Sequence, residues 1–347
     1  MYQKLGEVTL KDGSQMEIGV VLAPDPAHAE EIRPFLAHKP APYDEHIRRS
    51  LLEPLDALET RFYVGKIAGR IVANVMTVEH RGCGILGHVY THPDFRRRGA
   101  CDAIMRLQME DFRQRGGRAL YLGTGFDSPP YHIYRRHGFR SVYPGSGAMV
   151  YQAEEGFERR YFAPRPVQSR PVRWEDWGPM NALTSILVGD WLRSVSVLRR
   201  VEGPTHIEAS FLQMRQQVEA GEALVRVLAA EDGAVVGFGA IGRHPLWREV
   251  RLLELFCHPN FFDRVPELVQ PLMKAADRPL IAYADEESVQ KIAALRSLGF
   301  EVEARLRDRV RRRLRPDWEP SSPEADRDDP SAFVDRPLDL FLLRWEP

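Results

Sequence analysis

The clearest local pattern in this sequence is Val89-Tyr90-Thr91-His92-Pro93-Asp94-Phe95-Arg96-Arg97-Arg98-Gly99-Ala100-Cys101-Asp102. It reads as the end of a strand, a basic turn with one glycine, and the start of a helix. Backbone N–H groups at a helix N-terminus point outward together and, with the helix dipole, favour an anion, and Gly99 would let phosphate oxygens approach the backbone closely. Taken alone, the pattern predicts either a phosphate site or an ordinary solvated basic turn.

Strands and helices alternate around this stretch. β-Rich runs and apolar periodicity predict, in chain order, a strand at 16–22, helices at 27–37 and 43–52, a hairpin at 61–78, a strand at 84–91, a helix at 100–115, a strand at 118–123 and a helix at 129–137. A mixed order of this kind predicts an α/β (α+β) fold, with helices on the faces of a mixed sheet.

Several landmarks recur in the second half of the chain. The pair His92-Pro93 returns as His258-Pro259 after 166 residues, and Gly138-Phe139 returns as Gly299-Phe300 after 161 residues. Landmarks in the same order at nearly one spacing predict a duplicated domain, with two unrelated α/β units as the alternative.

The stretch between the two halves is polar and contains three prolines. Such a composition is typical of a linker between domains. We therefore expect an N-terminal domain at 1–152, a linker at 153–171 and a C-terminal domain at 172–347.

Length and composition narrow the class of protein. The chain has 347 residues, enough for two domains, and its 48 Lys and Arg against 49 Asp and Glu argue against nucleic-acid binding by bulk charge. Three scattered cysteines are too few for a disulfide framework or a four-ligand zinc site. The N-terminus lacks the apolar core of a signal peptide, and the most apolar stretch, 234–242, is far shorter than the roughly 20 residues that span a bilayer. We expect a cytoplasmic protein with free thiols, no membrane segment and no metal site.

The stretch from Val89 to Cys101 resembles the acetyl-CoA signature of the GNAT superfamily of N-acetyltransferases, commonly written Arg/Gln-x-x-Gly-x-Gly/Ala. The downstream run Tyr134-Arg135-Arg136-His137-Gly138-Phe139 and the order of elements are similar to that family too. The motifs cover about residues 16–151, whereas 172–344 resembles the family in architecture only. Cys101 departs from the signature because it occupies the last small position. We interpret it as a compact packing residue in preference to a reactive thiol.

The resemblance implies acetyl-CoA as cosubstrate and two sheet strands that splay apart where it binds. The pyrophosphate would be held by Arg96, Arg97, Arg98, Gly99, Ala100 and Cys101. The pantetheine arm would pair, like an added strand, with the backbone of Val89, Tyr90 and Thr91. The expected reaction is direct transfer of the acetyl group to an amine.

Transfer to an amine requires that the amine lose a proton and that the leaving thiolate gain one. By the resemblance, Tyr134 is the proton donor, and simple packing on the sheet is its alternative. His88 is the candidate base because an imidazole titrates near neutrality. A purely structural histidine and a reaction without a dedicated base are the alternatives. Glu79 and His92 are lesser candidates, and Ser128 is expected to cap the helix that carries Tyr134.

The second half of the chain keeps the order of elements but lacks these residues. Alignment on the two His-Pro pairs places Phe262 opposite Arg96 and Val265 opposite Gly99, and the Gly-Phe pairs place Leu295 opposite Tyr134. A valine and an aromatic ring do not form an open amide cradle for phosphate. We therefore expect the C-terminal domain to lack acetyl-CoA binding and to shape the acceptor cleft or mediate self-association.

These patterns predict a tandem-domain N-acetyltransferase with one working site, in its N-terminal domain. The partner would be a small-molecule or peptide amine, not a nucleic acid or a membrane, and a homodimer is an option. Two alternatives stay open. One is an acyltransferase that uses another acyl-CoA or a non-amine acceptor, and the other is a catalytically silent CoA-binding sensor or scaffold.

Overall fold

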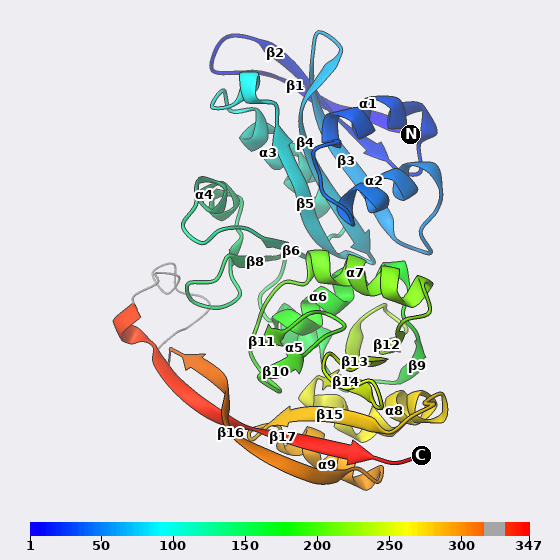
Figure 1. The fold of residues 1–347 in the computed structure, drawn as a ribbon. Coiled ribbons are helices and arrows are strands. Elements are labelled where there is room, and N and C mark those ends of the chain that lie inside the picture. The colour runs from blue at the N-terminus through cyan, green and yellow to red at the C-terminus, as the bar shows by residue number, and fades with distance from the viewer. Residues whose placement is uncertain (316–329) are drawn as a thin grey trace. The chain divides into compact units, whose positions relative to one another are not determined.

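The computed structural model describes residues 1–315 and 330–347, which form two compact units. Unit 1 comprises Met1–Arg140, Met149–Phe157 and Arg173–Gly178, and unit 2 comprises Ser141–Ala148, Glu158–Val172 and Pro179–Pro347. Each unit is built around one large sheet with helices packed against it (Figure 1). The α/β class with mixed sheets is therefore confirmed.

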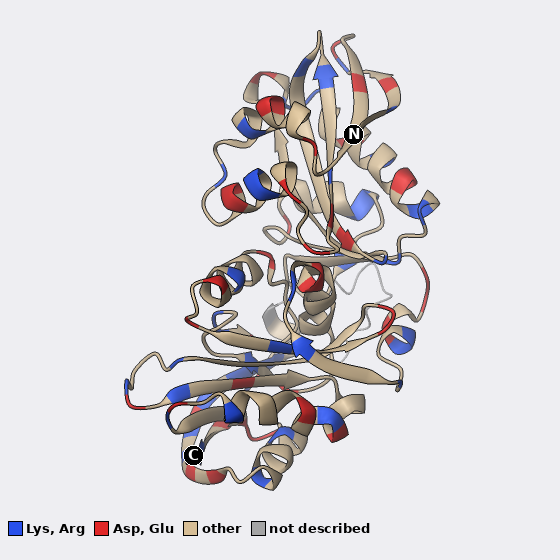
Figure 2. Cartoon of the chain, turned by 90° about the vertical axis from the view of Figure 1, so that its right-hand side faces the viewer, with Lys and Arg blue, Asp and Glu red and all other residues tan. Residues whose placement is uncertain are grey.

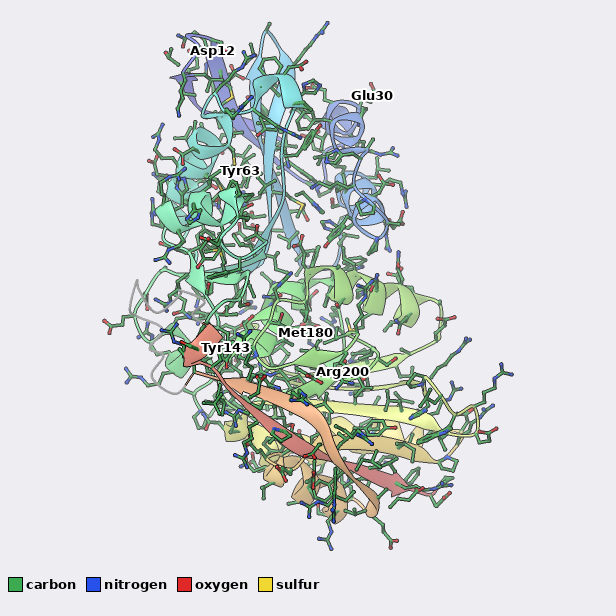
Figure 3. All side chains as sticks on the ribbon, turned by 60° about the vertical axis from the view of Figure 1, so that its left-hand side comes forward. Asp12, Glu30, Tyr63, Tyr143, Met180 and Arg200 are labelled. Carbon is green, nitrogen blue, oxygen red and sulfur yellow. The ribbon has the colours of Figure 1, made fainter. Side chains whose placement is uncertain are left out.

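The sheet of unit 1 has eight strands in the order β1-β2-β3-β4-β5-β6-β8-β7. Neighbours from β1 to β5 are antiparallel, and β5 pairs with β6 in parallel. The strands are β1 (Tyr2–Thr9), β2 (Gln15–Leu22), β3 (Glu59–Ile67), β4 (Arg70–His80), β5 (Cys83–Thr91), β6 (Ala119–Gly123), β7 (Arg140–Ser141) and β8 (Ala148–Gln152). The helices are α1 (Pro26–Leu36), α2 (Tyr43–Leu52), α3 (Ala100–Gln114) and α4 (Pro129–Arg136). Helices α1 and α2 lie on one face of the sheet and α3 lies on the other (Figures 1 and 3).

Most elements of unit 1 form where the sequence predicts them. The expected hairpin becomes β3 and β4, which turn at Ala68 and Gly69, both with positive φ (47° and 77°). Strand β1 was not expected, because its residues show no clear alternation of apolar and polar side chains. It pairs with β2 along nearly its whole length and extends the sheet by one strand.

Strand β5 is irregular at His88. The register with β4 shifts between Asn74 opposite Tyr90 and Met76 opposite Gly87, so that two residues of β5 face one residue of β4. This is a β-bulge, and His88 has a φ of +49° there. As a result, His88 and Val89, although consecutive, have different neighbours: His88 lies beside Tyr43 of α2, and Val89 lines the pocket described below.

Strands β5 and β6 pair over only three residues, the last pair being Ile85 with Tyr121. Beyond this point the two strands separate, as the resemblance implies. The bulge and the separation lie next to each other in β5. Together they open the sheet immediately before the signature stretch.

A network of hydrogen bonds and ion pairs joins α3 to strands β3 and β4 of the sheet. The hydroxyl of Tyr63 donates a hydrogen bond of 2.6 Å to Oδ2 of Asp111. Arg115 donates to Asp111 at 2.9 Å and to both carboxylate oxygens of Glu79 at 2.9 and 3.0 Å. Glu79 is thereby fixed in a structural ion pair.

Unit 2 contains a seven-stranded sheet in the order β16-β17-β15-β14-β13-β12-β9. Its strands are β9 (Val167–Pro171), β12 (Leu224–Ala230), β13 (Val235–Arg243), β14 (Arg251–Cys257), β15 (Leu280–Asp285), β16 (Glu301–Leu314) and β17 (Val334–Trp345). A small second sheet consists of β10 (Leu192–Ser194) and β11 (Val201–Glu202). The helices are α5 (Phe157–Tyr161), α6 (Trp177–Ser185), α7 (Glu208–Glu219), α8 (Val265–Lys274) and α9 (Val289–Ser297).

The two large sheets share a strand order. The series β2-β3-β4-β5-β6-β8-β7 in the first corresponds to β9-β12-β13-β14-β15-β17-β16 in the second, and β14 pairs with β15 in parallel as β5 does with β6. In both, two helices stand between the first and second strands of the series. This is the arrangement that a duplicated domain would have.

The linker expected at 153–171 has regular structure instead. It contains α5, and Val167–Pro171 form β9, which pairs with β12 from Arg226 opposite Pro171 to Ala230 opposite Val167. Two of the three prolines, Pro166 and Pro171, stand at the ends of this strand, and β9 is the edge of its sheet, where proline is tolerated. The polar, proline-containing composition that predicted a linker therefore belongs, at 167–171, to an edge strand.

Basic and acidic residues are interspersed along the ribbon in both units (Figure 2). Such mixing agrees with the formal net charge of −1. Across residues 1–315 and 330–347, none of the helices combines the length and the apolarity that crossing a bilayer requires.

Candidate active site

The connection from β5 to α3 forms an open, left-handed turn. Pro93–Phe95 make a 3₁₀ turn that is capped by the side chain of His92, whose Nδ1 accepts a hydrogen bond from the backbone N–H of Asp94 at 3.4 Å. Arg97 and Gly99 then both have positive φ, at 63° and 92°. Gly99 is the N-cap of α3, and a Cβ built on it would approach only Lys11, at 3.9 Å. Its backbone conformation, not lack of space, therefore requires glycine.

The three arginines of this turn have different surroundings. Arg96 donates from Nε to the carbonyl of Thr91 at 3.1 Å. Arg98 forms an ion pair with Asp12, at the β1–β2 turn, and its guanidinium lies 5.0 Å from the ring centre of Phe95. Only Arg96 and Arg97 present their side chains to the pocket described next.

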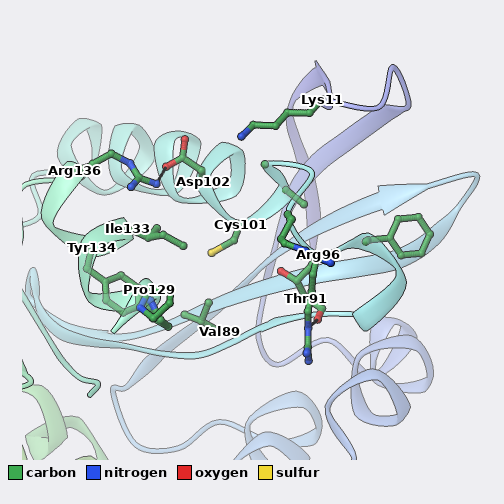
Figure 4. Close-up of a pocket in the computed structure, with 15 residues that line it drawn as sticks. Lys11, Val89, Thr91, Arg96, Cys101, Asp102, Pro129, Ile133, Tyr134 and Arg136 are labelled. Carbon is green, nitrogen blue, oxygen red and sulfur yellow. Dashed lines mark hydrogen bonds and ion pairs between the residues drawn. The ribbon is translucent and has the colours of Figure 1, made fainter. Parts of the chain in front are cut away.

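A pocket of about 490 Å³ lies between this turn, the end of β5 and helix α4 (Figure 4). Seven of the nine residues predicted to bind acetyl-CoA line it, namely Val89, Thr91, Arg96, Arg97, Gly99, Ala100 and Cys101. Tyr134 lines it from α4, opposite the start of α3. The signature and the proposed proton donor, more than thirty residues apart in the chain, thus share one pocket.

Tyr90 and Arg98 do not line the pocket with their side chains. The ring of Tyr90 packs against Phe35 and His38, with centroid distances of 5.1 and 3.9 Å. Side chains alternate across a strand, so Tyr90 points away when Val89 and Thr91 point in. Its backbone N–H and C=O remain part of β5.

The sequence did not indicate several other lining residues. Lys11 comes from the β1–β2 turn, Asp102 from the first turn of α3, and Pro130 and Ile133 from α4. Pro130, Ile133 and Tyr134 share the i, i+3, i+4 spacing of one helical face, so this part of the wall could have been found from Tyr134. Nothing local in the sequence indicated Lys11.

Helix α4 is well anchored at both ends. Ser128 caps it, since its Oγ accepts a hydrogen bond from the backbone N–H of Tyr131 at 3.4 Å, and the expected capping role is confirmed. Near the C-terminal end, His137 and Arg136 contact Oδ1 of Asp102 at 3.1 and 3.2 Å. Burial alone would raise the pKa of the Asp102 carboxyl. The hydrogen bonds from His137 and Arg136 outweigh this effect and hold the pKa below its ordinary value. These contacts tie α4 to α3.

Cys101 is a packing residue in the structure. Burial, with a smaller effect from Asp102, raises the pKa of its thiol to about 11. The thiol is therefore protonated near neutral pH, and it packs against the apolar core of unit 1. This agrees with the preference for packing over reactivity.

The base candidates lie outside the pocket. His88 is buried beside α2, with its ring 5.1 Å from that of Tyr43, edge to face. Burial, followed by the neighbouring His46, Lys39 and His38, lowers the pKa of His88 well below its ordinary value. Glu79 is held by Arg115, and His92 caps the 3₁₀ turn. Two of the three adjoin a pocket residue in the chain, His88 next to Val89 and His92 next to Thr91.

In unit 2, the region that corresponds to the pocket of unit 1 is occupied by the chain's own residues. Val265, opposite Gly99, is buried and right-handed, with a φ of −55°. Glu254, which aligns with His88, accepts hydrogen bonds from Ser194 Oγ at 2.7 Å and from the backbone N–H of Val197 at 3.1 Å. The N–H of Leu192 donates to Asp285 on β15 at 2.8 Å. Residues 192–197 thus bind to both β14 and β15, which pair only at 251–253 and 280–282.

Fold and pocket together define a mixed α/β protein with an arginine- and glycine-containing turn beside a pocket, at the point where the sheet opens. Comparison with known families is more specific. Residues 59–141 match the family model for the acetyltransferase (GNAT) domain, so unit 1 contains a GNAT acetyltransferase domain. The match ends one residue after β7 begins and includes the signature and Tyr134.

Several solved acetyltransferases are similar to about half of the chain. An N-acetyltransferase from Staphylococcus aureus Mu50 is 14% identical over 52% of this chain and 99% of its own, with a TM-score of 0.38. A ribosomal-protein-alanine N-acetyltransferase from Brucella melitensis is 18% identical over 52% and 99%, with a TM-score of 0.36. A phosphinothricin acetyltransferase from Sinorhizobium meliloti, in complex with AcCoA, is 17% identical over 52% and 89%, with a TM-score of 0.35. No curated protein matches the chain.

Proposed function

We propose that unit 1 is an acetyl-CoA-dependent N-acetyltransferase. The observation that carries the proposal is the shared pocket, which brings the left-handed turn at Arg97 and Gly99 together with the hydroxyl-bearing Tyr134. The left-handed turn suits the binding of a phosphate-rich cosubstrate, and the hydroxyl of Tyr134 suits proton transfer. The matched GNAT domain supports the same activity.

The pocket fits acetyl-CoA in its charge and shape. Arg96 and Arg97 would neutralise the pyrophosphate, and the backbone N–H groups from Arg98 to Cys101 would hydrogen-bond its oxygens. The side chain of Arg98 would act indirectly, because its ion pair with Asp12 fixes the turn. The backbone of Val89, Tyr90 and Thr91, left unpaired by β6, would bind the pantetheine arm as an added strand.

Bound acetyl-CoA would supply an activated thioester. In the reaction, the amine nitrogen bonds to the thioester carbonyl carbon, the C–S bond breaks, and the sulfur leaves as thiolate. The amine gives up one proton and the thiolate takes one up, so the number of protons balances. Backbone N–H groups at the bulge of β5 would stabilise the negative charge on the carbonyl oxygen.

We assign Tyr134 as the proton donor to the thiolate. Its side chain lines the pocket while 93% of the residue is buried, which keeps water away from the hydroxyl. His88 is our candidate acceptor of the amine proton. Because its imidazole is neutral at physiological pH, it has a free lone pair with which to take up that proton.

We propose further that unit 2, within the predicted domain 172–347, does not bind acetyl-CoA. Val265 and Phe262 replace the open turn, and residues 192–197 cover the place where β14 and β15 separate. Isothermal titration of the full chain should therefore give one acetyl-CoA per chain. A second saturable site that survives disruption of Gly99 would contradict this assignment.

The proposed activity is tested by the release of free thiol from acetyl-CoA in the presence of a panel of amines. We expect release to depend on the amine and the N-acetylated product to appear by mass spectrometry. Tight acetyl-CoA binding without turnover on any amine would favour the sensor. Faster turnover with a longer acyl-CoA, or transfer to an alcohol, would favour the acyltransferase alternative.

A further inference from the structure

A cluster of polar side chains, several of whose atoms lack a hydrogen-bond partner, is buried under α2, on the side of β5 away from the acetyl-CoA pocket. His46, Asn74 and His88, which we call the histidine cluster, are 0%, 1% and 5% exposed. His46 has neither ring nitrogen hydrogen-bonded within the described residues, and Nε2 of His88 and Oδ1 of Asn74 also lack a partner there. The rings of His46 and His88 are 6.1 Å apart.

So many unpaired atoms in one small region are unusual. Buried polar atoms in folded proteins nearly always have a hydrogen-bond partner, and exceptions commonly mark a ligand or an ordered water. The unpaired atoms of the histidine cluster include the amide oxygen of Asn74 and the lone pair of a neutral imidazole, both of which accept hydrogen bonds. The cluster therefore suits a ligand with N–H groups to donate.

The charges around the cluster are positive or absent. Burial lowers the pKa of His46 to about 3, with Arg49 on the same helix adding to the effect. Besides burial and His46, the groups that lower the pKa of His88 are Lys39 and His38, in the segment between α1 and α2. No carboxylate among the described residues acts on either ring. Of the acids in the first turn of α2, Glu45 is paired with Arg48 at 2.7 Å and Asp44 is exposed.

These surroundings do not suit an ammonium ion. A positive ligand at the cluster would meet neutral rings and like charges, with no carboxylate to balance it. An uncharged amine meets no such penalty. A simple alkylamine is almost entirely protonated at pH 7, with about 1 in 10³ molecules neutral for a lysine-like pKa.

Aromatic side chains adjoin the cluster on its more exposed side. Tyr43 contacts His88 edge to face at 5.1 Å, and Tyr90, two residues further along β5, packs with Phe35 and His38. Tyr43, Phe35 and Tyr90 are half-buried and His38 is exposed. Flat aromatic groups pack favourably against such rings.

We propose that the acceptor approaches the thioester from the α2 side of β5, beside the histidine cluster, and that it is an uncharged, weakly basic aromatic amine. The proposal rests on the function proposed above. In it, the N–H groups of the amine donate to Asn74 Oδ1 and to an imidazole, and the ring lies against Tyr43 and Tyr90. His88 takes up the amine proton only in passing as the C–N bond forms and hands it on to solvent, because its surroundings disfavour a charged ring. The thiolate receives its proton from Tyr134.

The first test compares aniline with benzylamine, two amines of similar shape but very different basicity. At pH 7 we expect kcat/KM for aniline to exceed that for benzylamine by at least about tenfold, because most benzylamine is protonated. Spermidine, a strongly basic polyamine, should be acetylated more slowly still. If benzylamine or spermidine is acetylated as fast as aniline, this inference is wrong while the acetyltransferase assignment stands. If acetyl-CoA binds and no amine is acetylated, the assignment itself is wrong.

A pair of variants at Tyr43 isolates the effect of charge. Tyr43→Glu places a carboxylate next to His88, and Tyr43→Gln gives nearly the same shape without charge. Tyr43 is half-buried in the first turn of its helix, where an acidic residue is well tolerated. Relative to Tyr43→Gln, the Glu variant should lower the aniline-to-benzylamine ratio at least about threefold, since a nearby anion favours ammonium binding. An equal ratio in the two variants contradicts the electrostatic argument.

Binding can also be followed without turnover. Adding aniline in the absence of acetyl-CoA should shift the imidazole NMR signals of His46 and His88, which a His46→Gln variant helps to assign. Exposed His132 on α4 serves as the internal reference. Shifts at other histidines, with none at His46 or His88, would place the acceptor elsewhere and overturn the proposal.

Discussion

The side-chain amide of Asn74 on β4 donates a hydrogen bond of 3.0 Å to the main-chain carbonyl of His88 on β5. This carbonyl lies in the bulge, where the regular ladder is interrupted, so a side chain supplies the donor that the neighbouring strand does not. Asn74 is 1% exposed, and no solvent replaces it. One buried amide thus holds β5 in the shape that opens the sheet.

Replacing Asn74 by Ala should destabilise the fold. It leaves a buried carbonyl without its donor, which costs about 1–3 kcal/mol. Urea unfolding measures the loss. The matched change Gln15→Ala, at an exposed position of β2, should stay within about 0.5 kcal/mol of the parent. An unfolding free energy of Asn74→Ala equal to that of Gln15→Ala would show that the bulge does not depend on this bond.

Gly99→Ala should weaken acetyl-CoA binding. A Cβ disfavours the φ of +92° that opens the turn, so the N–H groups should no longer converge. We expect Kd to rise at least about tenfold, or 1.4 kcal/mol, by calorimetry. Gly69→Ala is the control, because Gly69 has a φ of +77° in the β3–β4 turn, with open space around it, and does not line the pocket. Equal effects of the two changes would mean that general strain, not the turn, sets the affinity.

Tyr134→Phe should slow turnover without weakening acetyl-CoA binding. Removing a proton donor typically lowers kcat by about 10²–10⁴-fold, while the ring still fills its place in the pocket wall. Tyr131→Phe makes the same chemical change on the same helix, at a buried site outside the pocket, and should keep kcat near the parent value. A normal kcat in Tyr134→Phe would remove this hydroxyl from the mechanism.

Cys101 should resist alkylation. With a pKa of about 11, its thiolate fraction at pH 8 is about two orders of magnitude below that of a free cysteine. Iodoacetamide labelling followed by peptide mass spectrometry measures the rate, and Cys101→Ala identifies the labelled peptide. Reaction at the rate of free cysteine would mean that the thiol is activated.

Acidification should destabilise the fold through His46. Its pKa is about 3 when folded, against about 6.5 in an unfolded chain. Between these values the unfolded state binds a proton that the folded state does not, so the unfolding free energy falls as pH drops, by up to about 1.4 kcal/mol per pH unit. His46→Gln should reduce this slope in urea unfolding between about pH 7 and 5, and His132→Gln, at an exposed site, should not. Equal slopes in both variants would assign the acid sensitivity to other groups.

Local patterns in the sequence predict the core of unit 1 well. The hairpin, β5, α3 and α4 each follow from the spacing of apolar residues and from prolines and glycines at their ends. The turn from Arg96 to Gly99 is recognisable because its chemistry is contained in a few consecutive residues. The same holds for Ser128, which caps α4 as expected.

Features that depend on distant segments are not predictable in this way. The bulge at His88 arises from pairing with β4, and it decides which side chains of β5 face the pocket. Arg98 points to Asp12, 86 residues away, although its neighbours in the motif face the pocket. Edge strand β9 looked like a linker because proline and polar residues are common in both.

The β1–β2 turn gives the first residues of the chain an unexpected importance. Lys11 donates its backbone N–H to the carbonyl of Arg98 at 3.0 Å, and Asp12 holds the guanidinium of the same arginine. A protein shortened to begin at Met16, where the recognisable motifs start, would retain every signature residue yet lose both attachments. Expression and tagging schemes for unit 1 should therefore preserve the opening hairpin, because it carries two attachments of the turn from Arg96 to Gly99.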